Sequence, residues 1–318
     1  MHNPQILISI IIPLYNKELY FKQCFISVTK QTYKNIECII VEDCSSDNSL
    51  KLAESLIMDY KGNIKFVLLE HKQNKGLSVA RNTGINNANG EYVYFLDSDD
   101  EITDNCINSL VMLAGKYPET DIVQGNIIRR SIIDNSIYEA KFKLPEFVKG
   151  NSIIKKKYSK YFPKTSWNKL IRKKFVTDNY LYFKAGLIHE DILWFFFVMK
   201  KVETVSYTDE YCYIHNVVPD SIMQQQNLIP SILGCLTAYE EMLHNLDTDL
   251  LEYQLLKIRK DIKQQKKKIL SDERYLHLLP RYKALLAKTP NGIFFLFIYF
   301  RYYILKIMEI VKGKINDA

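Results

Sequence analysis

In the stretch Glu91-Tyr92-Val93-Tyr94-Phe95-Leu96-Asp97-Ser98-Asp99-Asp100, an apolar run of strand length is followed directly by three acids. Three earlier apolar runs also predict strands, namely Ile6 to Pro13, Ile36 to Glu42 and Ile64 to Glu70. Between these strands, apolar residues at helical spacing predict helices over Tyr20 to Lys30, Ser49 to Tyr60 and Leu77 to Ala88. Because strands and helices alternate, the sequence predicts βαβ units in an α/β fold with a mostly parallel sheet flanked by helices.

The composition is that of an ordinary globular protein. The 318 residues are 47% hydrophobic and 25% charged, which excludes collagen-like, low-complexity and disordered chains and allows two or three folding units. The six cysteines form no C-x-x-C pair, so we expect a reducing compartment rather than a disulfide framework. The apolar start at Ile6 lacks the basic residues and cleavage site of a signal peptide. We therefore expect a cytoplasmic protein.

Polar residues follow three of the predicted strands, and in such sheets ligands bind beyond the carboxyl ends of the strands. The three stretches are Pro13-Leu14-Tyr15-Asn16, Glu42-Asp43-Cys44-Ser45-Ser46-Asp47 and Asp97-Ser98-Asp99-Asp100. Gathered carboxylates repel one another unless a hard cation lies among them, and Mg²⁺ or Mn²⁺ commonly joins one or two carboxylates to phosphates. This pattern predicts a metal-bridged nucleotide diphosphate. The alternative is that these acids make turns, cap helices or lie in a solvated loop.

The same stretches resemble a family of enzymes, the family 2 glycosyltransferases with a GT-A fold. The resemblance is carried, in the family's order and spacing, by Ile10 to Asn16, Val41 to Asp47, Asn74-Lys75-Gly76-Leu77-Ser78-Val79-Ala80-Arg81-Asn82 and Phe95 to Asp100. It is strong over residues 6 to about 115, fair to about 222 and weak beyond.

The resemblance implies roles for individual residues of the first half. Asp43 is implied to bind the nucleotide base, Arg81 to lie near the nucleotide, and Asp97 and Asp99 to be the acids of a D-x-D motif that reach the ribose and the metal. The remaining residues implied to line the nucleotide site are Pro13, Tyr15, Asn16 and Ser98. Carboxylates suit these roles because they accept hydrogen bonds from base and ribose but need a cation beside phosphate.

A second motif is predicted where two acids precede an apolar helix, Ile192 to Met199. Glu190-Asp191 resembles the family's Glu-Asp motif, in which the final acid is the general base that deprotonates the acceptor hydroxyl, with Glu190 on the acceptor side. The alternative is that both are acids in the first turn of a helix, where they complement its dipole.

Two further features resemble parts of the same family. Trp167-Asn168-Lys169-Leu170 matches a recurring stretch and implies that Trp167 and Asn168 lie on the acceptor side, although a core Trp followed by a solvated Lys explains it equally well. His215 matches a position that ligates the metal in some members. A lone histidine is more often structural.

The resemblance implies an inverting glycosyltransferase of surface polysaccharide synthesis. It would use Mn²⁺ or Mg²⁺ and move a sugar from a nucleotide diphosphate, with UDP favoured by the family, to a hydroxyl of a glycan or polyprenyl-linked acceptor. Glu42 and Cys44 depart from the family's usual Asp and Gly, which leaves the base open. The alternatives are a sugar-phosphate nucleotidyltransferase, whose Gly-rich amino-terminal loop is missing, and a non-catalytic nucleotide-sugar-binding scaffold. No feature indicates nucleic acid as a partner.

The basic charge lies at the carboxyl end. The net charge is +7, but residues 257–318 alone hold 15 basic and 5 acidic side chains. We predict a catalytic domain over residues 1–223, with a nucleotide-sugar half (1–115) and an acceptor half (116–223), followed by a helical region over 224–318. The aromatic segment from Ile293 to Val311 contains charged residues that argue against a membrane span. It predicts peripheral binding to the inner face of the cell membrane, unless it packs on the domain and the lysines are simply solvated.

Overall fold

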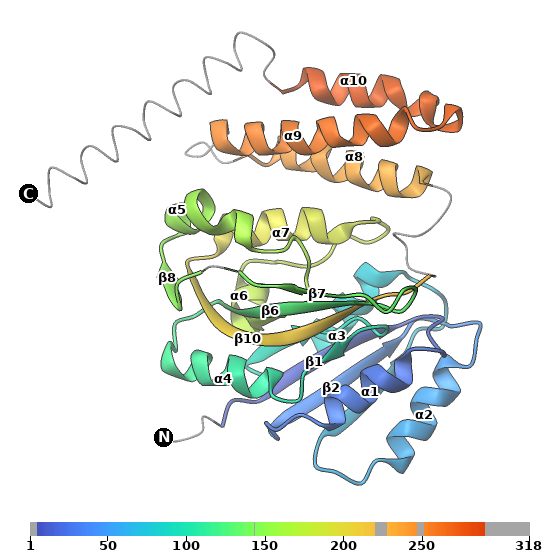
Figure 1. Cartoon of the computed structure of the whole chain (residues 1–318), viewed down its shortest axis with the longest axis vertical. Coiled ribbons are helices and arrows are strands. Elements are labelled where there is room, and N and C mark those ends of the chain that lie inside the picture. The colour runs from blue at the N-terminus through green and yellow to red at the C-terminus, as the bar shows by residue number, and fades with distance from the viewer. Residues whose placement is uncertain (1–4, 143, 220–227, 247–250, 290–318) are drawn as a thin grey trace, which may run out of the picture. The chain divides into compact units, whose positions relative to one another are not determined.

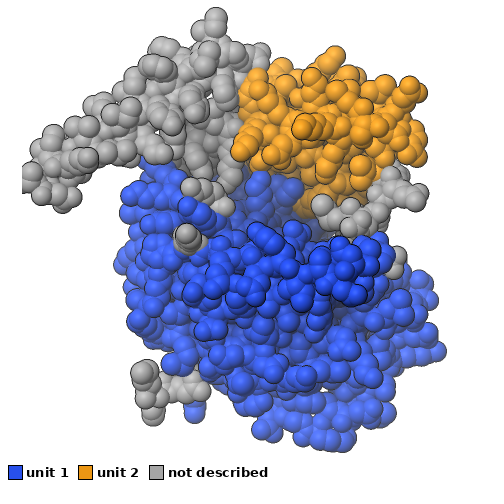
Figure 2. Space-filling view, viewed as in Figure 1, with its two compact units in different colours: residues 1–186, 190–225 blue, residues 187–189, 226–318 orange. Residues whose placement is uncertain are grey.

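The computed structural model describes residues 5–142, 144–219, 228–246 and 251–289. The chain forms two compact units, the first comprising residues 1–186 and 190–225 and the second residues 187–189 and 226–318 (Figure 2). The predicted domain boundary between residues 223 and 224 lies outside the described residues and stays a prediction.

The first half of unit 1 is a parallel sheet with helices between its strands (Figure 1). Its strands lie in the order β3-β2-β1-β4. They are β1 (Ile8–Leu14), β2 (Ile36–Glu42), β3 (Lys65–Glu70) and β4 (Tyr92–Phe95), and the helices between them are α1 (Phe21–Thr29), α2 (Ser49–Asp59) and α3 (Leu77–Asn87). Every residue of β1, β2 and β4 is buried, which explains why these strands are continuously apolar. The α/β prediction is confirmed.

The second half extends the same sheet with mixed pairing. Beyond β4 the order continues with β9 (Lys169–Arg172), β6 (Ile122–Ser131), β10 (Thr204–Val217) and β5 (Glu101–Ile102). Strand β9 is antiparallel to both β4 and β6, whereas β6 and β10 are parallel. Two short strands pair antiparallel at the side, β7 (Ile137–Ala140) with β6 and β8 (Phe147–Lys149) with β10. The other helical segments of this half are α4 (Cys106–Lys116), α5 (Asn151–Ile153), η1 (Ile154–Tyr158), η2 (Ser159–Tyr161), α6 (Lys173–Asp178) and α7 (Glu190–Lys201).

Two apolar cores lie on opposite faces of the sheet because side chains alternate along each strand. Ile10 belongs to the core that includes α1 and α4, whereas the next residue, Ile11, belongs to the core that includes α3, α6 and α7. In the second core, Trp194 of α7 packs edge-on to Phe95 of β4, with 6.2 Å between ring centroids. Its indole Nε1 donates to the Leu181 carbonyl over 2.9 Å. This packing fixes the start of α7 on the α3 face of the sheet.

Unit 2 is helical, as predicted for the carboxyl region. Its described segments are α8 (Ile229–His244), α9 (Leu251–Ile269), η5 (Glu273–Leu278) and α10 (Leu279–Ala287). The basic run lies in α9, where Ile258 and Ile262 are buried while Lys260 and Lys266 are exposed. None of the helices in the described part of the chain is long and apolar enough to cross a membrane. The predicted membrane-surface segment, residues 293–311, lies outside the described residues.

Candidate functional site

The acids after β4 form a tight turn that sorts them into one buried and two accessible carboxylates. The Asp100 amide donates to the Asp97 carbonyl over 3.0 Å. The buried Asp100 carboxylate accepts from the Tyr213 hydroxyl and the Asn216 amide of β10, each over 2.7 Å. Burial, with Asp99 and then Asp97 nearby, raises the pKa of Asp100 well above its usual range. Anchored through Asp100, the turn leaves the side chains of Asp97 and Asp99 accessible, at 27% and 18% exposure.

A buried guanidinium ties this turn to the start of α7. Arg81 of α3 is 1% exposed. Its Nη2 donates to Asp97 Oδ1 over 2.8 Å, and its Nη1 donates to Asp191 Oδ1 over 3.3 Å and to Glu190 Oε1. The three carboxylates raise the pKa of Arg81, which stays charged. Arg81 therefore brings the two predicted acid motifs together, and both of its terminal nitrogens bind acids of the protein.

Asp191 combines partial exposure with raised basicity. Its side chain is 19% exposed. Burial raises the pKa of Asp191 to about 6, against the opposing effect of the Arg81 guanidinium. Glu190 and Asp191 are also the acids in the first turn of α7, so the helix-dipole alternative describes their position as well. A carboxylate with this pKa and exposure can take a proton from a hydroxyl near neutral pH.

The Trp-Asn-Lys stretch packs against β10, the strand whose Tyr213 anchors the acid turn. Trp167 stacks on Tyr213 and His215 of β10, with 4.4 Å and 5.5 Å between ring centroids. Asn168 is fully buried, and its Nδ2 donates to the Gly125 carbonyl of β6 over 2.7 Å, so this side chain ties the stretch to the sheet.

Lys169, which the alternative interpretation treats as solvated, is instead fully buried at the start of β9. Its Nζ donates to the Thr165 carbonyl over 2.7 Å. Burial lowers the pKa of Lys169 to about 7, partly offset by the charge of Asp191.

His215 has the chemistry of a ligand. Within the described residues, its buried Nδ1 has no hydrogen-bond partner. Burial lowers the pKa of His215, and the charge of Arg129 adds to this effect, while Asp97 and Asp99 oppose it. The imidazole is therefore neutral at physiological pH, as a metal ligand must be.

The predicted base-binding acid also organises a loop. Asp43 is buried, its Oδ1 accepts from the Lys75 amide over 2.9 Å, and its Oδ2 accepts from the Gly76 amide over 2.7 Å. His71 Nδ1 lies 2.6 Å from the same Oδ1. Gly76 has φ +84°, a left-handed conformation that favours glycine, at the start of α3. Because each carboxylate oxygen can accept two hydrogen bonds, Oδ2 keeps capacity for one more donor.

Glu42 and Cys44, which depart from the family's usual residues, are explained by the turn around Asp43. The buried Glu42 carboxylate accepts from the Cys44 amide over 3.0 Å and from the Ser45 amide over 2.7 Å. Cys44 has φ +60°, the conformation for which glycine is the usual choice. Glu42 thus stabilises a turn in which Cys44, although not a glycine, adopts the left-handed conformation.

The end of β1 lies beside the loop that carries Asp43, whose amide donates to the Leu14 carbonyl over 2.9 Å. Pro13 lies beyond Ile11–Phe95, the last pair that β1 makes with β4, so its missing N–H leaves no gap in that ladder. Tyr15 is exposed. Asn16 adopts φ +49°, and its Oδ1 accepts from the Ser46 amide over 2.8 Å, which joins the loops after β1 and β2.

Sequence reasoning missed Lys17. Its Nζ lies 2.7 Å from Asp99 Oδ2, so an ammonium already pairs with the acid predicted to hold a metal. No sequence pattern signals this pair, because 82 positions separate the two residues.

Asp99 and His215 have the chemistry to ligate a divalent cation whose coordination shell is completed by phosphate oxygens. Among the residues that the structure describes, no three His, Cys, Asp or Glu side chains converge as a metal site. Asp99 and His215 offer one carboxylate and one neutral imidazole. Mg²⁺-type sites commonly take one or two protein ligands and fill the shell with substrate phosphates and water.

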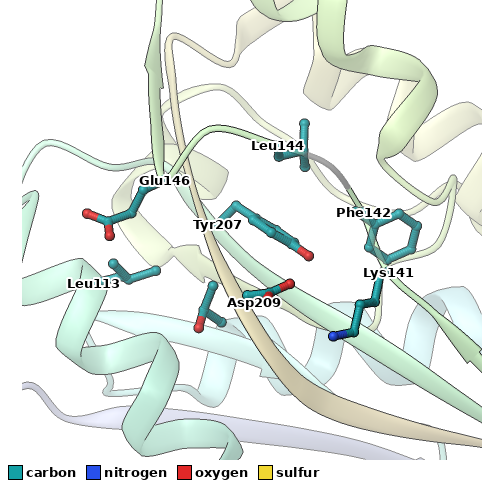
Figure 3. A pocket seen from close by; sticks show the side chains of 8 residues that line it. Leu113, Lys141, Phe142, Leu144, Glu146, Tyr207 and Asp209 are labelled. Carbon is teal, nitrogen blue, oxygen red and sulfur yellow. The ribbon is translucent and has the colours of Figure 1, made fainter.

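A separate cavity of about 490 Å³ lies in the second half of unit 1 (Figure 3). It is lined by Leu113, Lys141, Phe142, Leu144, Glu146, Tyr207, Thr208 and Asp209. None of these residues belongs to the acid cluster around Arg81, so the cavity is distinct from the candidate site.

Comparison with known proteins identifies the family of the chain. The family model described as "Glycosyl transferase family 2" matches residues 9–179, more than half of the chain. The chain belongs to glycosyl transferase family 2. The chain is 32% identical over 228 residues to the Escherichia coli (strain K12) protein named "Uncharacterized glycosyltransferase YibD", covering 69% of this chain and 65% of YibD.

Two Staphylococcus aureus proteins are also similar. The chain is 34% identical over 195 residues to the poly(ribitol-phosphate) beta-N-acetylglucosaminyltransferase TarP of strain N315, covering 54% of this chain and 58% of TarP. The matched part thus spans less than two thirds of YibD and of TarP. The crystal structure of TarS residues 1–349 in complex with UDP-GlcNAc superimposes with a TM-score of 0.71 at 21% identity, covering 90% of this chain and 82% of that one. This likeness confirms the GT-A fold.

Proposed function

We propose that the chain transfers one sugar from a nucleoside diphosphate sugar to a hydroxyl group of a glycan or lipid-linked acceptor, with inversion, in the synthesis of a surface polysaccharide. The observation that carries this proposal is the cluster in which Arg81 holds Asp97 together with Glu190 and Asp191. TarS binds UDP-GlcNAc and TarP is named for a poly(ribitol-phosphate) acceptor, which favours UDP and a polymeric acceptor here.

In this proposal Asp191 is the general base. The acceptor oxygen attacks the anomeric carbon as its proton passes to Asp191, and the bond from that carbon to the diphosphate oxygen breaks. A single in-line displacement of this kind inverts the anomeric configuration. Glu190 and Arg81 fix the position of Asp191, and the adjacent buried Lys169 balances part of the local negative charge.

The nucleotide would lie over the ends of β1, β2 and β4. We assign the base to the pocket formed by Pro13, Tyr15, Asn16 and Asp43, and the ribose to Asp97 beside Ser98. Asp99 and His215 would hold a Mn²⁺ or Mg²⁺ ion. When bound, this cation neutralises the charge that develops on the departing diphosphate.

Donor binding is testable by thermal unfolding. A ligand at 100 times its Kd stabilises the folded state by about 2.7 kcal/mol, so we expect a UDP-sugar with Mn²⁺ to raise Tm by about 5 °C. The panel contains UDP-, GDP- and dTDP-sugars with Mn²⁺ or a chelator, and nucleoside triphosphates as controls. Stabilisation by a triphosphate alone would favour a nucleotidyltransferase. No shift with any nucleotide sugar would contradict the proposal.

A lipid-linked acceptor would place the enzyme at the inner face of the membrane. Residues 293–311 include seven aromatic side chains, and each basic residue near an anionic surface contributes about 1 kcal/mol of attraction. We expect the full chain to float with anionic liposomes at low salt and less at high salt, and a chain ending at Asn291 to float less. If neither chain floats at low salt, the membrane proposal is wrong.

A further inference from the structure

One ion pair crosses the candidate site between two different loops. Lys17, in the loop after β1, places its Nζ 2.7 Å from Asp99 Oδ2, in the turn after β4. Both side chains are partly exposed, at 19% and 18%, so water and ligands can reach the pair. The ammonium therefore occupies one of the two carboxylate oxygens of the acid proposed to ligate a cation.

The backbone on each side of this pair is held in place independently of it. The Lys17 amide donates to Ser49 Oγ over 2.8 Å, and its carbonyl accepts from the Phe21 amide over 2.9 Å. The Asp99 carbonyl accepts from Asn216 Nδ2 over 2.8 Å. The loops thus keep their positions if the ion pair opens. Only the Lys17 side chain, a flexible stem with a compact charge, has to move.

We propose that Lys17 is a donor-site cation that exchanges partners, neutralising Asp99 in the free enzyme and turning to the diphosphate when the donor and its metal ion bind. This inference rests on the proposed function. The inference extends the proposed function, because it gives the leaving diphosphate a second positive charge that the chain itself supplies.

Local charge favours such an exchange. Asp97 and Asp99 lie in one turn, where the Arg81 guanidinium donates to Asp97 and the Lys17 ammonium pairs with Asp99. Without ligand, the ammonium is therefore the partner of Asp99. A divalent cation on Asp99 replaces that partner, and the arriving diphosphate offers the displaced ammonium a charge-assisted hydrogen bond close to its former position.

The experiment titrates the full chain first with Mn²⁺ and then with UDP. Free Mn²⁺ is measured by electron paramagnetic resonance without nucleotide, and UDP binding by calorimetry at saturating Mn²⁺. The variants are Lys17→Met, Lys17→Arg and the double variant Lys17→Met/Asp99→Asn. Lys22→Met is the matched control, because it removes the same charge from an exposed position on α1.

The exchange predicts opposite effects on the two ligands. Lys17→Met should bind Mn²⁺ roughly two- to fivefold more tightly, because a competing, partly exposed ion pair is gone. It should bind UDP at saturating Mn²⁺ about tenfold more weakly, because a charged hydrogen bond to phosphate is lost. Lys17→Arg should restore UDP binding, the double variant should lose the gain in Mn²⁺ affinity, and Lys22→Met should match the wild type.

Two outcomes would overturn the inference, and they are distinguishable. If the wild type binds Mn²⁺ and UDP but Lys17→Met leaves both affinities unchanged or lowers both, the ion pair is only structural and the proposed function stands. If the wild type binds neither ligand, the proposed function fails and this inference fails with it.

Discussion

Asp191→Asn is expected to lose roughly 10² to 10⁴ in turnover while its donor affinity stays within a few-fold of the wild type. The reason is that Asp191 acts on the acceptor proton, and an amide of the same shape cannot accept it. Turnover is measured as nucleoside diphosphate release, and donor affinity by calorimetry. The control is Asp178→Asn, which makes the same chemical change at an exposed acid of α6. Unchanged turnover would show that Asp191 is not the general base and serves only as an acid in the first turn of α7.

The pH profile of the wild type gives a second test of the same role. Burial raises the pKa of Asp191 to about 6, and only the ionised carboxylate can act as a base. Arg81, Glu190, Asp97 and Lys169 are the charged groups around it. Turnover should therefore rise with pH through about 6 and fall about tenfold for each pH unit below it. A profile that stays flat down to pH 4.5 would contradict the assignment.

Arg81→Met is expected to lower the free energy of unfolding by about 3–5 kcal/mol, the usual cost of removing one partner from a buried ion pair. The guanidinium is 1% exposed and serves Asp97, Glu190 and Asp191, so its loss leaves three carboxylates without their counter-charge. Unfolding in urea measures this effect.

The matched control is Arg129→Met, which removes an exposed arginine of β6 and should change the free energy of unfolding by less than about 0.5 kcal/mol. If Arg81→Met unfolds at the same urea concentration as Arg129→Met, Arg81 is not the residue that holds the acid cluster together.

The first half of the fold was predictable because its signals are local. β2 lies at Ile36–Glu42, as predicted, and α3 ends one residue before the predicted Ala88. Buried parallel strands are continuous apolar runs, and the helices between them carry apolar residues at helical spacing. Neither feature depends on distant residues, so the sequence alone was enough to predict both.

The second half depends on long-range pairing that no local pattern shows. β9 has four residues and begins with a lysine, Lys169, opposite Gln124 of β6. Hydropathy assigns such a lysine to solvent. Insertion of β9 between β4 and β6 buries it instead.

Within the site, sequence motifs predicted which acids to consider but not what holds them. Arg81 and Glu190 are 109 positions apart, and their contact depends on how Trp194 seats α7 on the sheet. The pair between Lys17 and Asp99 likewise joins two loops. Such partners follow from tertiary packing, so a motif quoted from the sequence cannot name them.

The most direct measurement is nucleoside diphosphate release from a panel of nucleotide sugars in the presence of Mn²⁺ and a cell-surface glycan or lipid-linked acceptor extract. The account predicts that one donor, a UDP-sugar, supports acceptor-dependent release by the wild type, and that Asp191→Asn binds this donor yet releases almost none. Equal release by both proteins, or donor binding by the wild type without release in any acceptor mixture, would contradict the claim that this acid cluster catalyses sugar transfer.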